Sequence, residues 1–309
     1  MAVKGVLKNM LKNERMRQLF QNEVYSGRII RMMVAPDALA AKICENLGAK
    51  ALFSAGYATS ASALAMPDRG ITDFGISLKR TQEIIDAVDI PVFADADTGY
   101  GDTGNVRRTV ENYEAIGAAG LFIEDQVWPK RCGHMGGKQV VATEILEEKI
   151  KVAAKTRKND NFLIMSRTDA RSVYGLEEAI QRSKRYKAAG ADLIFIEAPQ
   201  SYEELVTIHE AFPETPLMAN MIEDGMTPLV DSEDLERLGF NIVTYPTALT
   251  YAQSYAEEQL IKHLNHDGST KAYKDHMITF PKFNEFIGLE HVNEQDETYA
   301  PEKMRQYMR

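Results

Sequence analysis

The chain has 309 residues, of which 44% are hydrophobic and 26% are charged, and its formal net charge is −9 at pH 7. A length of this order suits one α/β barrel with extra terminal helices, and no apolar run approaches the roughly 18 residues that span a bilayer. An acidic chain offers phosphate backbones no broad basic surface, so we expect neither nucleic acid nor a membrane as a partner.

The first twenty residues, MAVKGVLKNMLKNERMRQLF, are basic and place apolar side chains near helical spacing. They lack the continuous apolar stretch and the cleavage site of a secretory signal. We therefore expect residues 1–26 to form a helix that caps the fold or contacts another subunit.

Eight short β-rich runs follow, and amphipathic segments of helical period separate them. The segments that end in Gly or Asn, which is typical of helix C-caps, include residues 105–120, 143–160 and 175–192. Eight alternations predict a (β/α)8 barrel over residues 27–252, whereas the alternative, an open doubly wound sheet, lacks a G-x-G-x-x-G motif after its first strand. The expected strands are residues 29–34, 51–53, 92–94, 121–123, 162–165, 193–196, 217–219 and 242–244.

Residues 253–309 contain further helical stretches and end in the charged tail EHVNEQDETYAPEKMRQYMR. No Gly/Ser or Pro tract separates them from the barrel. We expect a helical extension that contacts another subunit.

The chain has two cysteines, Cys44 and Cys132, too few for a disulfide framework and consistent with a reducing cytoplasm. Cys44 lies on the apolar side of a helical pattern, so we expect it in the core. Cys132 lies among charges and glycines, where a structural thiol would be out of place.

Polar residues follow almost every expected strand, and the C-terminal ends of barrel strands converge on one face. Asp95, Asp97 and Glu124 follow neighbouring strands and come without histidines. Carboxylate oxygens of this kind suit Mg²⁺ or Mn²⁺ rather than zinc, with some of the acids acting through water.

Arg167 ends the next strand, and its planar guanidinium matches a carboxylate bidentately. The small-residue turn Ser54, Ala55 and Gly56 offers N–H groups that could close around the same carboxylate. A metal, an arginine and an amide turn together predict a site for a 2-hydroxy or 2-oxo acid.

The long connection after the fourth strand carries Lys130, Cys132 and His134, which face one way if the segment is extended. We expect flanking cations to lower the pKa of the Cys132 thiol so that it can exchange a proton. Gly133, Gly136 and Gly137 would give hinge freedom to a lid over the substrate.

Three segments, DADTGYGD (95–102), IEDQVWPKRCGHMGGK (123–138) and SRTDA (166–170), resemble the isocitrate lyase/phosphoenolpyruvate mutase superfamily. The resemblance implies a Mg²⁺-dependent (β/α)8 barrel, assembled as a homotetramer with its last helix exchanged between subunits. It also implies chemistry through an enolate or aci-carboxylate. By motif position it implies that Asp95, Asp97 and Glu124 bind the metal, that Cys132 protonates the departing carbanion, and that Asp68 is a further active-site acid; the implied substrate-binding residues are Ser54, Ala55, Gly56, Gly133, Arg167, Glu197 and Asn220.

Branches of the superfamily differ in substrate, and Cys132 favours C–C cleavage because the phosphonate branch generally lacks this cysteine. Methylisocitrate lyases usually have Thr and Arg where this chain has Ile222 and Tyr251. An unpaired, desolvated carboxylate costs several kcal/mol, so a tricarboxylate is disfavoured. These features, with Trp128-Pro129, Met135 and residues 279–289, resemble the branch of 2,3-dimethylmalate lyase, petal death protein and oxaloacetate acetylhydrolase, although oxaloacetate hydrolases tend to have Ser where this chain has Pro246.

The sequence thus predicts a cytoplasmic Mg²⁺-dependent lyase, with Mn²⁺ as a possible substitute, acting on a small dicarboxylate such as 2,3-dimethylmalate. Retro-aldol cleavage would give pyruvate and a short carboxylic acid. The base for the hydroxyl proton stays open between Tyr57, Asp68 and a metal-bound water. The alternatives are 2-methylisocitrate cleavage, oxaloacetate hydrolysis or decarboxylation, phosphorus–carbon mutase chemistry and a non-catalytic barrel.

Overall fold

A computed structural model describes residues 2–301 of the chain, and the side chains of residues 12–301. The chain forms two compact units, Met1–Tyr251 and Ala252–Arg309. No helix among the described residues has both the length and the apolar character needed to cross a bilayer.

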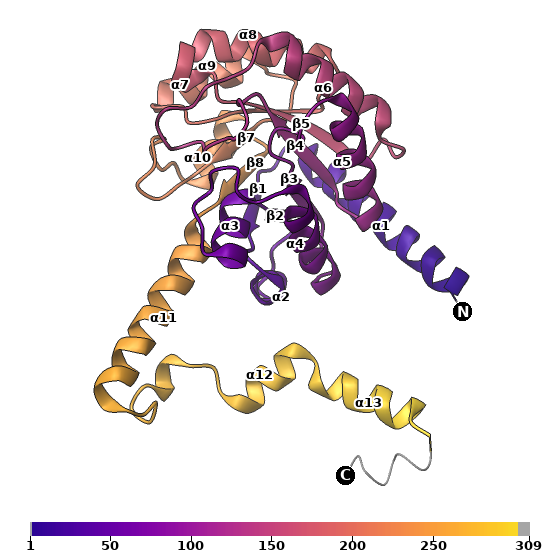
Figure 1. The fold of residues 1–309 in the computed structure, drawn as a ribbon, viewed down its shortest axis with the longest axis vertical. Coiled ribbons are helices and arrows are strands. Elements are labelled where there is room, and N and C mark those ends of the chain that lie inside the picture. Colours follow the sequence, from indigo (N-terminus) through magenta and orange to yellow (C-terminus); the bar gives the residue numbers. More distant parts are fainter. Residues whose placement is uncertain (1, 302–309) are drawn as a thin grey trace. The chain divides into compact units, whose positions relative to one another are not determined.

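The first unit is built on a parallel sheet of eight strands in the order β6-β5-β4-β3-β2-β1-β8-β7 (Figure 1). A parallel bridge between Ile194 and Leu217 joins the two edge strands, and the N–H of Ile194 donates to the carbonyl of Pro216 at 3.0 Å. The sheet therefore nearly closes into the predicted (β/α)8 barrel, and the doubly wound alternative is wrong. The strands are β1 Ile30–Val34, β2 Leu52–Ser54, β3 Val92–Asp95, β4 Gly120–Glu124, β5 Leu163–Thr168, β6 Leu193–Ile196, β7 Met218–Asn220 and β8 Ile242–Tyr245.

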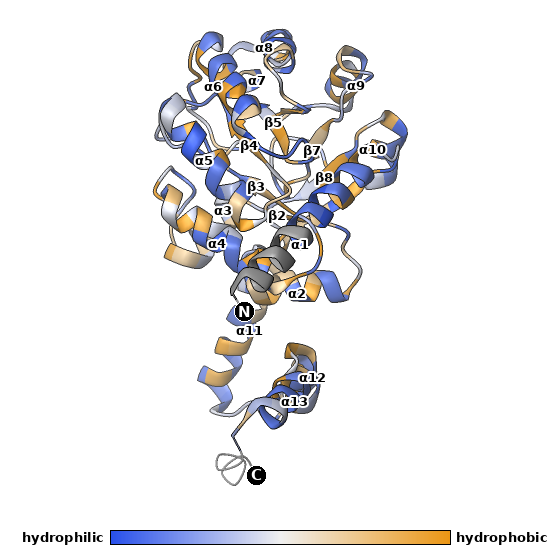
Figure 2. Cartoon of the chain, turned by 90° about the vertical axis from the view of Figure 1, so that its right-hand side faces the viewer, coloured by the Kyte–Doolittle hydropathy of each residue, from blue (hydrophilic) through white to orange (hydrophobic). Residues whose placement is uncertain are grey.

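Helices connect the strands and surround them, and much of α8 and α10 is hydrophilic (Figure 2). Several begin with a side-chain cap; Asp102, for example, forms a capping box with Asn105 at the start of α5. The helices of this unit are α1 Ala2–Val24, α2 Ala38–Asn46, α3 Gly56–Leu64, α4 Phe74–Ala87, α5 Thr103–Ile116, α6 Thr143–Thr156, α7 Arg171–Tyr174, α8 Leu176–Ala188, α9 Tyr202–Ala211 and α10 Ser232–Leu238.

Alternate residues of the strands form two apolar layers, as the two-residue period of a strand requires. One layer packs against the helices, and the other fills the barrel with side chains that include Phe53, Phe93 and Phe122. Phe20 and Val24 of α1 are fully buried in this inner layer, and the rings of Phe20 and Phe93 lie 5.4 Å apart. The N-terminal helix therefore caps the barrel.

The second unit consists of most of α11 (Ala248–Asp267), a 3₁₀ turn at Lys274–His276, α12 (Phe280–Ile287) and α13 (Leu289–Tyr299). Helices therefore make up most of this unit as far as Tyr299. No side chain of α11, α12 or α13 is buried.

Candidate active site

A cavity of about 430 Å³ lies where the C-terminal ends of the barrel strands meet. It is bounded by residues within or after every strand except β1. Most of the residues singled out from the sequence line it: Ala55, Tyr57, Asp68, Asp95, Cys132, Gly133, His134, Arg167, Glu197, Asn220, Ile222, Pro246 and Tyr251. Ser54, Gly56, Asp97, Glu124 and Lys130 do not line the cavity.

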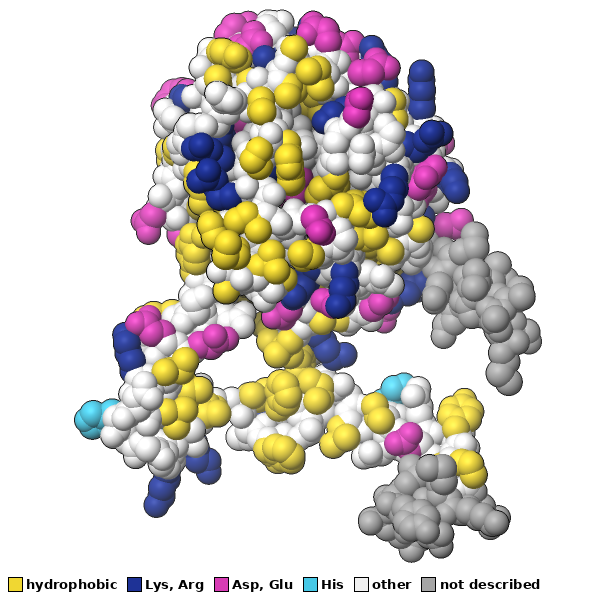
Figure 3. All heavy atoms as spheres, viewed as in Figure 1, with side chains coloured by type: hydrophobic (Ala, Val, Ile, Leu, Met, Phe, Trp, Pro, Cys, Tyr) yellow, Lys and Arg dark blue, Asp and Glu magenta, His cyan; other side chains and the backbone are white. Residues whose placement is uncertain are grey.

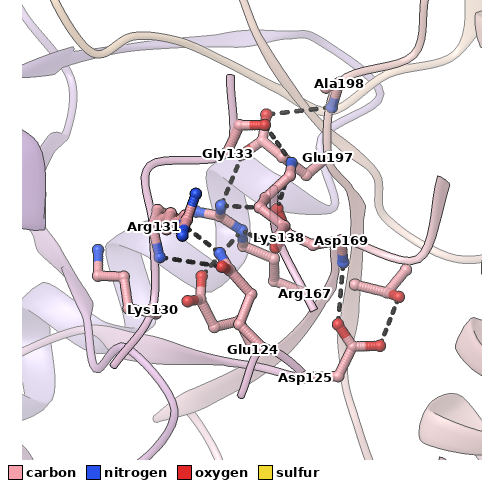
Figure 4. A network of polar contacts seen from close by, with 12 residues as sticks. Glu124, Asp125, Lys130, Arg131, Gly133, Lys138, Arg167, Asp169, Glu197 and Ala198 are labelled. Atoms are coloured by element: carbon pink, nitrogen blue, oxygen red, sulfur yellow. Dashed lines mark hydrogen bonds and ion pairs between the residues drawn. The ribbon is translucent and has the colours of Figure 1, made fainter. Parts of the chain in front are cut away.

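Arg167 is a buried cation at the centre of the site (Figure 4). Its Nε lies 3.1 Å from Glu124 Oε2 and 3.0 Å from Asp169 Oδ2, and its Nη2 lies 3.2 Å from Glu197 Oε2. Burial disfavours the charged guanidinium, but the three carboxylates outweigh it and raise the pKa of Arg167 well above its usual value. The arginine is therefore a fixed positive charge whose Nε and Nη2 already have acidic partners.

Glu197, His134 and the backbone of Met226 form a chain of hydrogen bonds. His134 Nδ1 accepts from the N–H of Met226 at 2.8 Å, so Nε2 carries the hydrogen that faces Glu197 Oε1 at 3.0 Å. Burial opposes ionisation of Glu197, yet Arg167 and the His134 hydrogen bond lower its pKa to about 2. These contacts give His134 a positioning role: it ties the loop after β4 to the loop after β7.

Asp95 is the last residue of β3, and Asp97 comes two residues later. The backbone of Asp97 lies in the left-handed region at φ +47°. Asp95 accepts the N–H groups of Gly56 at 2.9 Å and of Asp97 at 2.8 Å. Lys130 Nζ lies 2.8 Å from Asp97 Oδ1 and 2.7 Å from Asp68 Oδ1. Burial raises the pKa of Asp97 to about 7, although Lys130 opposes the shift.

The carboxylates of this cluster fit a divalent cation. Asp97 Oδ1 and Glu124 Oε2 are buried and have only their ion pairs with Lys130 and Arg167, and Glu124 Oε1 is buried without any hydrogen bond. Burial also raises the pKa of Glu124 well above its usual value, although Arg167 opposes the shift. Buried acids outnumber buried cations here by six to three, the acids being Asp68, Asp95, Asp97, Glu124, Asp169 and Glu197 and the cations Lys130, Lys138 and Arg167.

Within the described part of the chain, no three acidic, histidine or cysteine side chains are spaced to hold an ion as they stand. Mg²⁺ commonly takes only one or two protein carboxylates and keeps several waters. Hard oxygen donors, a surplus of buried acids over buried cations and a Glu124 carboxylate whose Oε1 has no partner therefore fit Mg²⁺ or Mn²⁺ at Asp97 and Glu124, with Asp95 beside them.

Ser54 and Gly56 differ from their expected role as a carboxylate-binding turn. The hydroxyl of Ser54 lies 2.9 Å from that of Thr81 on α4, and the N–H of Gly56 is bound to Asp95. A Cβ at position 56 would lie 3.0 Å from Asp95 Oδ2 and 3.2 Å from Lys130 Nζ. The turn thus supports Asp95, and of its three residues only Ala55 lines the cavity.

Cys132 presents its thiol to the cavity from a turn, not from an extended segment, because the N–H of Met135 donates to the Cys132 carbonyl at 2.9 Å. Burial raises the pKa of this thiol to about 11, with Asp68 and Glu197 adding to the shift. The expectation that flanking cations lower this pKa is wrong: Lys130 is paired with Asp68 and Asp97, and Arg131 donates to the Gly136 carbonyl. A thiol that stays neutral is suited to give up a proton.

We expected Gly133 to act as a hinge, but in the structure it allows the loop backbone to pack closely against Glu197 and Arg167. A Cβ there would lie 2.4 Å from Glu197 Cδ and 2.6 Å from Arg167 Nη2. The loop that carries Cys132 therefore lies directly against the ends of β5 and β6 in this structure.

Tyr57 and Tyr251 face each other across one wall of the cavity. Their hydroxyl oxygens are 3.0 Å apart, and their rings meet edge to face at 6.2 Å. Burial, together with this hydrogen bond, raises the pKa of Tyr57 well above its usual range, which disfavours Tyr57 as a base. Ile222 and Pro246 also line the cavity, so this wall, together with Tyr251, is apolar and aromatic.

Sequence reasoning missed part of the loop after β7. Glu223, Asp224, Gly225 and Met226 line the cavity, and Glu223 Oε2 accepts from the hydroxyl of Thr247 at 2.6 Å. These residues come within six positions of Asn220, so reading further beyond each strand end would have found them.

Comparison with known proteins places these features in a wider context. The sequence profile of the family described as phosphoenolpyruvate phosphomutase matches residues 20–264. A 2,3-dimethylmalate lyase from Eubacterium barkeri is 46% identical over 273 residues, which cover 87% of this chain and 94% of the relative.

Two solved structures share the fold over nearly the whole chain. An oxaloacetate acetylhydrolase in complex with 3,3-difluorooxaloacetate superimposes with a TM-score of 0.87 at 31% identity, covering 92% of this chain and 97% of the other. A phosphonopyruvate hydrolase in complex with oxalate and Mg²⁺ gives a TM-score of 0.84 at 26% identity, covering 93% and 99%.

Proposed function

The chain belongs to the phosphoenolpyruvate mutase/isocitrate lyase superfamily and is a lyase of that superfamily; we propose that it cleaves the C2–C3 bond of a 2-alkylmalate such as 2,3-dimethylmalate. The proposed products are pyruvate and a short carboxylic acid. The proposal includes dependence on Mg²⁺ or Mn²⁺ at Asp97 and Glu124, and the buried Glu124 carboxylate, which accepts no hydrogen bond, supports it.

The charge of the cavity wall carries the substrate proposal. Among the described residues that line the cavity, Arg167 is the one Lys or Arg side chain. Arg167 and a divalent cation make two positive groups, which suffices for the two carboxylates of a malate. A third carboxylate would meet Ile222, Pro246 and Tyr251 and would be buried without a partner, at a cost of several kcal/mol.

The residues of the site divide the chemistry among them. When bound, the divalent cation supplies Lewis-acid stabilisation of charge on the substrate oxygens. Arg167 pairs with a substrate carboxylate, and Glu197 and Asn220 hold Arg167 in place, since Asn220 Nδ2 donates to Glu197 at 3.1 Å. Asp68, which lines the cavity beside Lys130, is our candidate for taking the C2 hydroxyl proton.

Cleavage then moves two electron pairs and two protons. The C2 hydroxyl loses its proton to the base, and its oxygen forms the C2=O double bond of pyruvate as the C2–C3 bond breaks. The electron pair of the C2–C3 bond passes into the carboxylate on C3 as an aci-carboxylate. The neutral Cys132 thiol returns a proton to C3, and the resulting thiolate recovers it before the next turnover.

A second candidate, hydrolysis of oxaloacetate, is favoured by the structural similarity to an oxaloacetate acetylhydrolase. That reaction would use the same metal site and Arg167. Pro246 stands where such hydrolases tend to have a serine, which favours the lyase reading over this one.

A substrate panel tests the proposal. The enzyme with Mg²⁺ is offered 2,3-dimethylmalate, 2-methylisocitrate, isocitrate, oxaloacetate and phosphonopyruvate, and released pyruvate, glyoxylate, oxalate and phosphate are measured. We expect the highest kcat/KM with 2,3-dimethylmalate. Preferred turnover of 2-methylisocitrate would refute the pocket argument, and release of oxalate from oxaloacetate as the main activity would establish the second candidate.

Cys132→Ser tests the proton donor in the same assay. General acid catalysis contributes about 10²- to 10⁴-fold, so we expect kcat to fall by this factor while Mn²⁺ binding is kept. Cys44→Ala, a change at the other free thiol, is the control. Full activity of Cys132→Ser would exclude the proposed role.

We further propose that the chain acts in the cytoplasm, where its unpaired cysteines stay reduced, and that it is a homotetramer with α11 or the helices after it exchanged between subunits. The exposed apolar side chains of the second unit support this assembly: Tyr255, Ile261, Ile278, Phe280 and Val292 are each half exposed or more. Figure 3 shows such side chains gathered over the second unit.

A further inference from the structure

Lys138 is a buried cation at the end of the loop that carries Cys132. Its side chain is 1% exposed, although a lysine rarely loses contact with water unless it is paired. Its Nζ donates to the carbonyl of Gly133 and, at 2.8 Å, to Asp169 Oδ1. Neither Lys138 nor Asp169 lines the substrate cavity.

The two acceptors of Lys138 belong to different parts of the site. Gly133 follows Cys132 directly and lies so close to Glu197 and Arg167 that it has no room for a Cβ. Asp169 follows β5, and its other oxygen, Oδ2, lies 3.0 Å from Arg167 Nε. Lys138 therefore stands between the loop that bears the thiol and the carboxylate that orients the arginine (Figure 4).

Asp169 is also held by contacts with Asp125. Its N–H donates to Asp125 Oδ1 at 2.9 Å, and Asp125 Oδ2 accepts from the hydroxyl of Thr168 at 2.6 Å. Burial opposes ionisation of Asp169, but Arg167 and Lys138 outweigh it and lower its pKa. Lys138 thus anchors the loop to a charged carboxylate that Arg167 and the backbone contact with Asp125 also hold in place.

We infer that Lys138 is a positioning residue that holds the Cys132 loop against the Arg167 end of the cavity. Removing its charge would leave the Gly133 carbonyl without its donor and would leave Asp169 with one cation instead of two. The closed loop would lose its anchor at Gly133 and would open more often. The inference rests on the proposed function only in that Cys132 is taken as the group that protonates C3.

The test measures loop opening through the reactivity of Cys132, without substrate or metal. Lys138→Met, Lys138→Arg and the wild type are treated with iodoacetamide at pH 8.5, and peptide mass spectrometry follows Cys132 and Cys44 separately. We expect labelling of Cys132 to become roughly tenfold faster in Lys138→Met, as for the loss of a charge-assisted hydrogen bond, and to remain slow in Lys138→Arg. Lys187→Met removes a lysine that donates to Thr215 away from the site, and it should behave as the wild type.

Several outcomes would overturn the inference. Unchanged labelling of Cys132 in Lys138→Met, with Cys44 still protected, would show that Lys138 does not hold the loop. If Cys44 also becomes reactive, the variant has unfolded, and Lys138→Ala, which removes both the donor and the charge without adding a long apolar side chain, is measured instead. Slow labelling of Cys132 in a folded Lys138→Ala overturns the inference, and fast labelling supports it.

Activity supplies an independent readout. With the substrate found in the panel, Lys138→Met should lower kcat by about tenfold with little change in KM, and Lys138→Arg should restore most of it. If the panel finds no lyase substrate, the labelling result still stands, so failure of the proposed function and failure of this inference are separate outcomes.

Discussion

Glu124 is an acid that the fold buries with no hydrogen-bond donor on either oxygen, although Arg167 Nε lies 3.1 Å from one of them. Such a group is costly unless a further positive charge reaches it. A cation that binds the folded state but not the unfolded state raises the free energy of unfolding by about 2.7 kcal/mol when its concentration is a hundred times its Kd. We expect Glu124→Gln, which keeps the shape but not the charge, to lose most of this stabilisation.

Thermal unfolding with and without Mg²⁺ or Mn²⁺ measures the effect. Without metal, Glu124→Gln should be at least as stable as the wild type, because an unsatisfied buried acid has been removed. Glu214→Gln, an exposed acid away from the cavity, should keep the full metal-induced rise in Tm. A rise in Glu124→Gln equal to that of the wild type would move the metal site elsewhere.

The raised pKa of the Cys132 thiol predicts the pH range in which this residue reacts. Burial places its pKa at about 11, whereas a thiol in an unfolded chain titrates near 8.5. A raised pKa keeps the proton on sulfur through neutral and mildly alkaline pH, so at pH 8.5 the folded protein should hold about a hundredfold less thiolate than the denatured chain. Iodoacetamide labelling of the folded protein should therefore stay slow up to pH 9 and rise steeply toward pH 11; an inflection below pH 9 would contradict the burial of this thiol.

Two loops interlock over the cavity, one after β4 and one after β7. The imidazole of His134 accepts from the N–H of Met226, and it passes so close to Gly225 that a Cβ there would lie 2.6 Å from Nδ1 and 3.0 Å from the carbonyl of Ile222. Gly225→Ala should displace His134 and release its hydrogen bond to Glu197. Because one hydrogen bond contributes about 1 kcal/mol net, we expect kcat/KM to fall by roughly fivefold.

Gly104→Ala is the matched control for this change. Gly104 lies in the first turn of α5, and a Cβ there meets nothing within 4 Å. Steady-state kinetics of both variants with the panel substrate decide the matter. Equal kcat/KM for Gly225→Ala and Gly104→Ala would mean that the two loops are not coupled through His134.

At the scale of the whole barrel, patterning alone predicted the architecture. Each expected strand overlaps an observed one, because buried parallel strands appear as short apolar runs and their helices show a 3.6-residue period. The same periodicity placed Phe20 and its neighbours on a helix but could not say that this helix fills the end of the barrel. That contact depends on Phe93, which is far away in sequence.

The site was predictable as a set of residues but not as a set of contacts. Strand ends converge in any barrel, so Asp95, Cys132 and Arg167 could be brought together from the sequence. The direction of the Ser54 hydroxyl and the pKa of Cys132 depend on which partner each group meets across the fold. Lys130 is an example. It lies two residues before Cys132 in sequence, which suggested that its charge would act on the thiol, but in the fold it pairs with Asp68 and Asp97.

The second unit presents apolar side chains that no element of α11 to α13 buries. Phe280, at the start of α12, is 84% exposed, and Ile278 beside it is 57% exposed. Contiguous apolar surface of this kind is typical of subunit interfaces. If another copy of the chain covers it, a charge at position 280 should be buried without a partner and should weaken the assembly by several kcal/mol.

Light scattering after size exclusion measures the mass of the wild type and of Phe280→Glu. We expect the wild type to elute as a tetramer and Phe280→Glu to shift toward smaller species as it is diluted. Lys271→Glu, a charge change at an exposed position of the same unit, should leave the mass unchanged. A wild-type chain that is monomeric at micromolar concentration would refute the proposed assembly.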